Sequence, residues 1–92
     1  MHTRWTRQAS KNLESILEYI AADNPLAAKK LATDALLKIE RLEDFPLMGR
    51  TGILPMTREL VIHENYIVHY RVRDENIEIL RVLHAKRKFP SR

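Results

Sequence analysis

The 92-residue sequence contains no cysteine and only two glycines. The absence of cysteine excludes disulfide bonds, cysteine-ligated zinc, iron–sulfur clusters and thiol catalysis. Two glycines cannot supply a glycine-rich phosphate loop, which excludes nucleotide-binding motifs of that type. The spacing of the four histidines suggests no metal site. We therefore expect a protein that uses neither a metal ion nor another cofactor.

Long apolar runs are missing as well. No uncharged stretch reaches the ~18 residues that a membrane-spanning helix needs. A basic start followed by an apolar segment, the pattern of a secretory signal, is also absent. We therefore expect a cytoplasmic protein with no membrane partner. At 10.8 kDa and without internal repeats, residues 1–92 are expected to form a single domain.

Basic residues exceed acidic ones, 16 against 12, and the formal net charge is +4. The excess lies mainly in residues 56–92, which carry eight basic and five acidic side chains. The last nine residues carry four basic side chains and no acidic one. Such a tail suggests a polyanion or an acidic protein as partner, or it only keeps a small domain soluble.

The first half of the chain has the periodicity of two helices. Apolar residues recur at helical spacing from Ala9 to Ile20, which predicts a helix over residues 7–22 with Thr6 as its N-cap. Asn24 and Pro25 end this helix and begin a second one, expected over residues 25–44, because proline fits the first helical turn. Together the two helices are expected to form a helical hairpin.

From Met56 onward the periodicity is that of strands. We expect strands over residues 57–63, 66–72 and 77–84, joined by short turns, with a further short strand at residues 2–6. His69 and Arg71 are expected to face solvent or a ligand, because the residues that alternate with them are apolar and would face the helices: Tyr66, Val68, Tyr70 and Val72. The expected fold class is α+β, an antiparallel sheet packed on an N-terminal helical hairpin in the order β-α-α-β-β-β.

Basic residues are spaced through the predicted strands and follow the last one: Arg58, Arg71, Arg73, Arg81, Lys86, Arg87 and Lys88. Neighbouring antiparallel strands can gather several of them on one surface. Such a surface would bind phosphates, and it could stabilise the charge that develops in phosphodiester cleavage without a metal ion. Each arginine taken singly is better explained as solvated, or as paired with Glu59, Glu64 or Glu78.

His84 stands where the last strand meets the basic tail. A histidine there can act as a general acid near neutral pH, although a lone histidine is more often a structural hydrogen-bonding residue. In a regular strand Arg81 and His84 point to opposite faces, so they share a site only if the strand bulges or ends between them. Trp5 and Phe89 are aromatic residues near the termini that could stack on a base, and packing is the simpler role for Trp5.

Four stretches follow one another in an order that covers nearly the whole chain: WTRQASKNLESILEYIAADNPLAA, FPLMGRTG, TRELVIHENYIVHYRV and ILRVLHAKR. Together they resemble the RelE/ParE superfamily of toxins from bacterial type II toxin–antitoxin modules. The resemblance implies the α+β fold described above. It also implies a cognate antitoxin, whose flexible segment often crosses the groove between helices and sheet, and operator DNA bound only through that antitoxin.

The superfamily has two branches with different targets. RelE-like toxins cut mRNA on the translating ribosome, whereas ParE-like toxins poison DNA gyrase without known hydrolysis. If this chain is a nuclease, the resemblance implies Arg81, His84 and Arg58 as catalytic residues. The candidate target-binding residues in either case are Arg71, Lys86, Arg87 and Lys88.

One departure from the nuclease pattern and one likeness to the gyrase pattern favour the gyrase branch. The nuclease branch has an arginine directly after the first residue of the motif that reads YIVHYRV here, where this chain has Ile67. The YRV and RVLH runs look more like the gyrase branch. We therefore predict a toxin that poisons DNA gyrase. The alternatives are a ribosome-dependent mRNA endonuclease and a degenerate toxin that only binds antitoxin and regulates, so whether the chain is an enzyme stays open.

Overall fold

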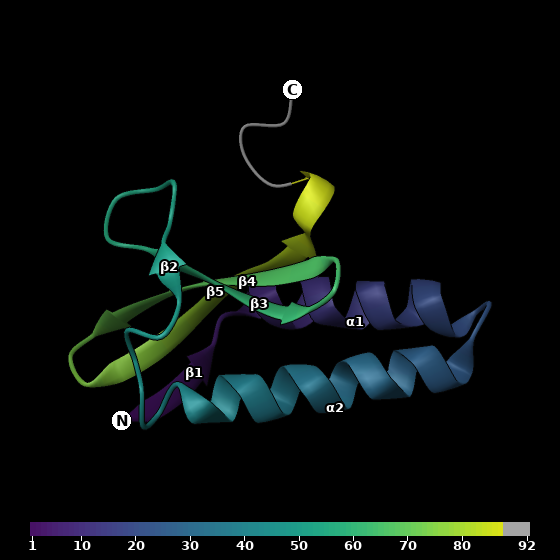
Figure 1. The fold of residues 1–92 in the computed structure, drawn as a ribbon, viewed down its shortest axis with the longest axis horizontal. Helices are drawn as coiled ribbons and strands as arrows, with labels where there is room; N and C mark the ends of the chain where they lie inside the picture. The colour runs from purple at the N-terminus through teal and green to yellow at the C-terminus, as the bar shows by residue number, and fades with distance from the viewer. Residues whose placement is uncertain (88–92) are drawn as a thin grey trace.

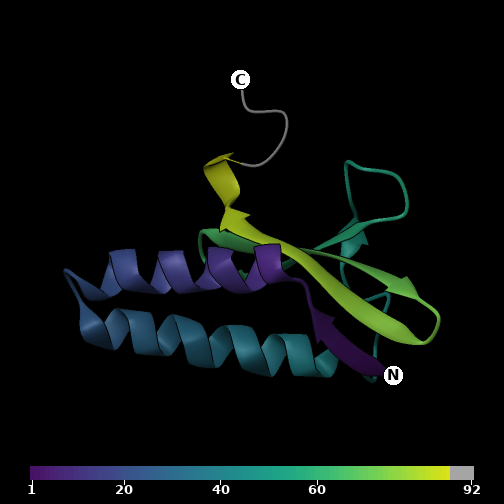
Figure 2. The same cartoon turned by 180° about the vertical axis from the view of Figure 1, so that it is seen from behind.

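The computed structural model describes residues 1–87 of the chain, apart from the side chain of Arg87. A short strand β1 (His2–Trp5) precedes the helices α1 (Arg7–Ala21) and α2 (Pro25–Arg41). The strands β2 (Arg50–Thr51), β3 (Arg58–His63), β4 (Tyr66–Arg73) and β5 (Asn76–His84) follow, and a turn of 3-10 helix, η1 (Ala85–Arg87), comes after them. Both helices lie on the same side of the sheet (Figures 1 and 2).

The helices begin at the predicted caps. The side-chain oxygen of Thr6 accepts a hydrogen bond from Ala9 N at 3.1 Å, and that of Asn24 accepts one from Ala27 N, also at 3.1 Å. Helix α2 ends at Arg41 rather than at residue 44, because residues 42–44 form a turn before Pro46. In the part of the chain that the structure describes, no helix is long and apolar enough to cross a membrane.

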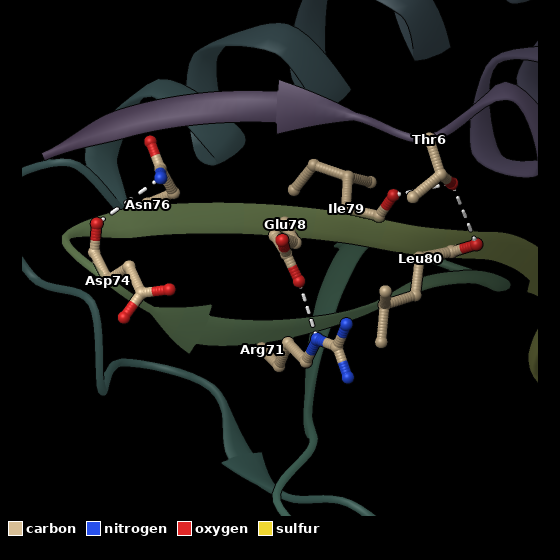
Figure 3. A network of polar contacts seen from close by, with 7 residues as sticks. All are labelled: Thr6, Arg71, Asp74, Asn76, Glu78, Ile79 and Leu80. Carbon is tan, nitrogen blue, oxygen red and sulfur yellow. Dashed lines mark hydrogen bonds and ion pairs between the residues drawn. The ribbon is translucent and has the colours of Figure 1, made fainter.

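The sheet has the strand order β1-β5-β4-β3-β2. The predicted α+β fold is confirmed with two differences: a short edge strand, β2, is added, and β1 runs parallel to β5, so the sheet is mixed rather than antiparallel. Thr6 fixes this arrangement, since its hydroxyl contacts the carbonyl oxygens of Ile79 at 2.8 Å and Leu80 at 3.2 Å (Figure 3). The chain therefore leaves β1 beside β5 and turns directly into α1.

The main core lies between the helices and the sheet. Ala35, Ile39 and Leu42 of the α2 segment pack against aliphatic side chains of the central strands, among them Ile62, Val68, Ile77, Ile79 and Val82. The four residues of β4 that were expected to face the helices all belong to this core or pack against it. That part of the strand prediction is confirmed.

The face of the sheet away from the helices, called the outer face below, differs from the prediction. His69 was expected to be exposed there, and that prediction was wrong, since only 3% of its surface is accessible. The reason is its place in β4, the middle strand of the sheet, where neighbours on both β3 and β5 cover it. Arg71 is partly exposed, with 37% of its side chain accessible.

Candidate functional site

Four neighbouring strands each contribute one charged or titratable residue to a row across the outer face. Arg50 lies opposite Glu59, Glu59 opposite His69, and His69 opposite Arg81. The neighbours of His69 in β4, Val68 and Tyr70, point into the helix-side core, so His69 points to the outer face. Arg50, Glu59, His69 and Arg81 are called the charged row below.

Glu59 occupies the centre of the charged row. Its Oε1 accepts a hydrogen bond from Arg50 Nε at 3.0 Å and lies 3.0 Å from Arg50 Nη2. Its Oε2 lies 3.3 Å from His69 Nε2. The side chains of Glu59 and His69 are 2% and 4% exposed, whereas that of Arg50 is 57% exposed. A buried carboxylate thus joins a buried imidazole ring to a guanidinium group at the surface.

A β-bulge in β5 decides where Arg81 lies. His69 pairs with Arg81 and Tyr70 pairs with Ile79, which leaves Leu80 as the extra residue. Because of the bulge, Ile79 and Val82 both reach the helix-side core, and Arg81 joins the charged row. The bulge precedes Arg81, so the regular alternation from Arg81 to His84 is kept. These two predicted residues therefore point to opposite faces of the sheet.

His84 lies in a groove between α1 and the end of β5, called the helix-side groove below. The groove has a volume of about 650 Å³ and is lined by Asn12, Ser15, Ile16, Tyr19, Tyr66, Val82, Leu83, His84 and Lys86. The ring of His84 meets that of Tyr66 edge-on, with 5.1 Å between ring centroids. The backbone N–H of Lys86 donates to His84 Nδ1 at 3.1 Å, so the neutral ring carries its proton on Nε2.

Arg58 lies apart from both of these places. Its Nη1 donates to the carbonyl oxygen of Gly49 at 2.8 Å, and its partner across the sheet is the core residue Tyr70. The Tyr70 hydroxyl donates to the Pro46 carbonyl at 2.8 Å and accepts from Gly49 N at 2.9 Å. A side chain on Gly49 has no room, because a Cβ atom there would lie 2.8 Å from that hydroxyl. Arg58 and Tyr70 thus fix the loop that leads into Arg50.

Burial keeps the Tyr70 phenol in its donating form. Removal from water raises the pKa of Tyr70 above its ordinary value of 10.0, and the Gly49 N–H and the Arg58 charge only partly oppose this effect. The hydroxyl therefore stays protonated at neutral pH and can donate to Pro46.

A second pair of opposite charges lies on the outer face, toward the β4–β5 turn. Arg71 Nε donates to Glu78 Oε1 at 2.5 Å (Figure 3). This hydrogen bond, helped by the charges of Arg71, Arg73 and Arg4, holds the pKa of Glu78 below its usual value. The Glu78 side chain is 22% exposed, so this pair is wetter than the pair of Glu59 and Arg50.

The structure does not bring the predicted catalytic residues together. Arg81 belongs to the charged row, His84 to the helix-side groove, and Arg58 to the loop before β2. Among the predicted target-binding residues, Arg71 lies on the outer face and Lys86 lines the helix-side groove. Lys88, the side chain of Arg87 and the aromatic residue Phe89 lie outside the described residues.

Arg50, Glu59 and His69 were missed as a group by the sequence analysis. Glu59 precedes the core residue Leu60, and His69 stands between the core residues Val68 and Tyr70, so strand alternation places both on the outer face. Their meeting depends on the register of β3 against β4, which local sequence does not reveal. Within residues 1–87, no cluster of three or more His, Asp or Glu side chains is arranged to hold a metal ion.

Sequence comparison assigns the chain to a known family. The family model for the ParE toxin of type II toxin–antitoxin systems, parDE, matches residues 3–89. The chain belongs to the ParE toxin family. It is therefore a toxin of the type II toxin–antitoxin class, which confirms the resemblance carried by its four sequence stretches.

Two relatives of this ParE-family chain are also described as toxins. Toxin Y4kP of Sinorhizobium fredii is 38% identical over 88 residues, which cover 95% of this chain and 91% of the relative. Toxin RelE2 of Caulobacter vibrioides is 35% identical over 83 residues, which cover 90% of this chain and 93% of the relative. One of these two relatives carries a RelE name, although the family model that matches the chain is that of the ParE toxin.

Solved structures share the fold. The chromosomal ParDE toxin–antitoxin system of P. aeruginosa contains a chain with a TM-score of 0.82 and 26% identity, over 91% of this chain and 95% of that one. The toxin–antitoxin complex RelBE2 of Mycobacterium tuberculosis gives a TM-score of 0.60 at 24% identity, over 90% of this chain and 95% of that one. The second likeness concerns the fold alone.

Proposed function

We propose that this ParE-family toxin arrests bacterial growth by binding and poisoning DNA gyrase. The observation that supports this proposal is the separation of Arg81 and His84 onto opposite faces of the sheet. Acid–base cleavage of RNA needs its groups within hydrogen-bond reach of one substrate. A toxin that acts by binding a protein target needs no such assembly, and the family assignment points the same way.

A cognate antitoxin is the second partner in this proposal. The solved relative from P. aeruginosa is described as a ParDE toxin–antitoxin system, which supports such a partner. We place a segment of the antitoxin in the helix-side groove, where Ile16, Tyr66 and Val82 offer an apolar floor. Lys86 lines the same groove and the chain carries a net charge of +4, so an acidic segment is favoured. Operator DNA would be bound only through the antitoxin.

The target is tested with purified components. Toxin added to DNA gyrase is expected to inhibit supercoiling, and stoichiometric antitoxin is expected to restore it. The proposal is wrong if supercoiling continues at a large molar excess of a toxin preparation that arrests cells.

The nuclease alternative is tested in cells. We expect growth arrest without new mRNA 5′ ends within minutes of induction. Fresh ends clustered within translated codons would instead establish a ribosome-dependent endonuclease, the branch to which the name of one relative belongs. A folded protein that arrests no bacterial host would support a degenerate toxin that only binds antitoxin.

The antitoxin groove is tested with Lys86→Glu. Reversing this charge is expected to lower antitoxin affinity by about tenfold, because it replaces attraction with repulsion at the rim of the interface. Lys30→Glu on α2, outside the groove, is the matched control and is expected to leave the affinity unchanged. Equal affinities for the two variants, measured by calorimetry, would move the antitoxin to another surface.

A further inference from the structure

The outer face buries charged or titratable side chains, although removing apolar side chains from water would cost less free energy. In the part of the chain that the structure describes, the buried polar or charged residues are Glu59 and His69. Replacing a buried ion pair by well-packed apolar residues is often neutral or stabilising, so fold stability alone is a weak reason for keeping one. Another role for the Glu59 carboxylate is therefore worth deriving from its contacts.

Those contacts hold Arg50 from two directions. Its backbone follows Gly49, which is held by the hydroxyl of Tyr70 and the guanidinium of Arg58. Its side chain is held by Glu59, which engages both Nε and Nη2. A free arginine side chain populates many rotamers, and much of this rotamer entropy is already lost here before any partner binds.

Arg50 remains available to a partner despite these contacts. Its side chain is 57% exposed at the edge of the sheet. Glu59 engages the Nε and Nη2 side of the guanidinium group, which has five N–H donors, and the Nη1 donors are left for a further acceptor. The guanidinium group is therefore both oriented and accessible. This combination lowers the conformational entropy that is lost when a partner binds.

The charge balance of the outer face indicates which acceptor it suits. Arg50 and Arg71 are each paired with a carboxylate of the chain itself, and Arg81 of the charged row lies opposite the buried His69. A nucleic-acid backbone is bound through several cations that neutralise phosphates, and internally paired arginines serve that purpose poorly. A single oriented guanidinium suits one carboxylate at a protein surface, where its planar geometry adds specificity.

We propose that Arg50 is a target-contacting residue that binds a carboxylate of the target protein, and that Glu59 is the positioning residue that orients it. This inference rests on the proposed function insofar as the target is a protein. It adds two residues that the sequence analysis did not place in any site. Arg50 makes the contact, and Glu59 acts through Arg50 from beneath the surface.

The test compares Arg50→Ala, Glu59→Gln and the double variant in the full chain. Arg50→Ala is expected to reduce growth arrest and target inhibition by about tenfold or more, with antitoxin affinity within about twofold of the parent. Glu59→Gln is expected to cause most of the same loss. The double variant is expected to be no weaker than Arg50→Ala, because residues that act through one contact have non-additive effects.

Matched controls remove the same charges elsewhere. Arg41→Ala at the end of α2 and Glu64→Gln in the β3–β4 turn alter exposed residues away from the charged row, and both are expected to retain full potency. Thermal unfolding of every variant separates lost potency from lost fold. If Glu59→Gln does not fold, Arg50→Lys takes its place, because lysine keeps the charge but loses the oriented planar group. It is expected to be as weak as Arg50→Ala.

Several outcomes would overturn the inference. Full potency of Arg50→Ala would remove Arg50 from the target interface. Full potency of Arg50→Lys would mean that charge alone suffices, so that an oriented planar group is not what the target binds. Additive losses from Arg50→Ala and Glu59→Gln would mean that Glu59 does not act through Arg50. An equal fall in antitoxin affinity would make the antitoxin the partner, and DNA affinity abolished by Arg50→Ala would make it a nucleic acid. Growth arrest measures the effect of Arg50→Ala whichever protein the toxin binds. A failure of the gyrase proposal can therefore be told apart from a failure of the inference about Arg50.

Discussion

The two faces of the sheet differ in whether they bury polar side chains. Toward the helices lies an aliphatic core in which Ile62, Ile77 and Ile79 have no accessible surface, whereas the outer face buries Glu59 and His69 beside Ile67. Burial of apolar surface stabilises a fold by about 25 cal/mol per Å², and burial of charge does not. The comparison indicates that apolar burial on the helix side supplies most of the fold's stability. The buried Glu59 and His69 on the outer face are better explained by a role in binding.

A smaller comparison lies within the outer face itself. Glu59 and Glu78 each bind an arginine, but the Glu59 side chain is 2% exposed and that of Glu78 is 22% exposed. Water competes with Arg71 for Glu78, but it hardly reaches the carboxylate of Glu59. The ion pair of Glu59 is therefore expected to be the stronger of the two. The predictions below probe both contrasts.

Removing a core side chain on the helix side is expected to have the largest effect. Ile79→Ala deletes methyl and methylene groups from a site with no accessible surface. We expect the free energy of unfolding in urea to fall by about 2–5 kcal/mol, because a cavity adds to the lost burial. A loss below about 1 kcal/mol would mean that the helix side is not the main source of stability.

Tyr70→Phe is expected to have an intermediate effect. The change removes a hydroxyl that donates to Pro46 O and accepts from Gly49 N, and it leaves both backbone groups without that partner. The expected loss is about 1–3 kcal/mol in urea denaturation. Faster amide hydrogen exchange at Gly49 and Arg50 should accompany it if this hydroxyl holds the loop, and unchanged exchange there would contradict that role.

Glu78→Gln is expected to have a small effect that depends on pH. Since the pKa of Glu78 is lowered in the folded chain, its charge stabilises the fold above the ordinary carboxylate pKa. That contribution is lost as the pH falls through the lowered value. The melting temperatures of parent and variant should differ slightly at pH 7 and converge in acid. A difference that grows on acidification would have the wrong sign.

His84→Asn is expected to have the smallest effect, on growth arrest. Asparagine can still accept a hydrogen bond from the Lys86 N–H that now bonds to His84 Nδ1. If the toxin acts by binding its target, arrest should remain within about twofold of the parent, whereas loss of a general acid lowers activity by about 10²–10⁴-fold. The measurement is growth rate at matched expression, and a loss of that size would restore the nuclease alternative.

Local signals accounted for much of this structure. Three kinds of signal lie close in sequence to the element that they predict: the helix caps Thr6 and Asn24, the apolar stripes of the helices and the alternation in β4. The family, too, follows from stretches in chain order. The candidate site was only partly predicted, because Arg58, Arg81 and His84 were chosen by residue type and by the family resemblance, neither of which reveals which side chains meet across the sheet.

By itself, the sequence determined the two helices, the strand-forming half and the absence of cysteine chemistry, since each depends on local periodicity or on composition. Only the tertiary structure decided that β1 joins β5 in parallel, that Leu80 forms a bulge and that Glu59 meets Arg50 and His69. These are pairings between distant segments. Their register is set by how the whole sheet packs on the helices, and a shift of one residue would send each side chain to the other face.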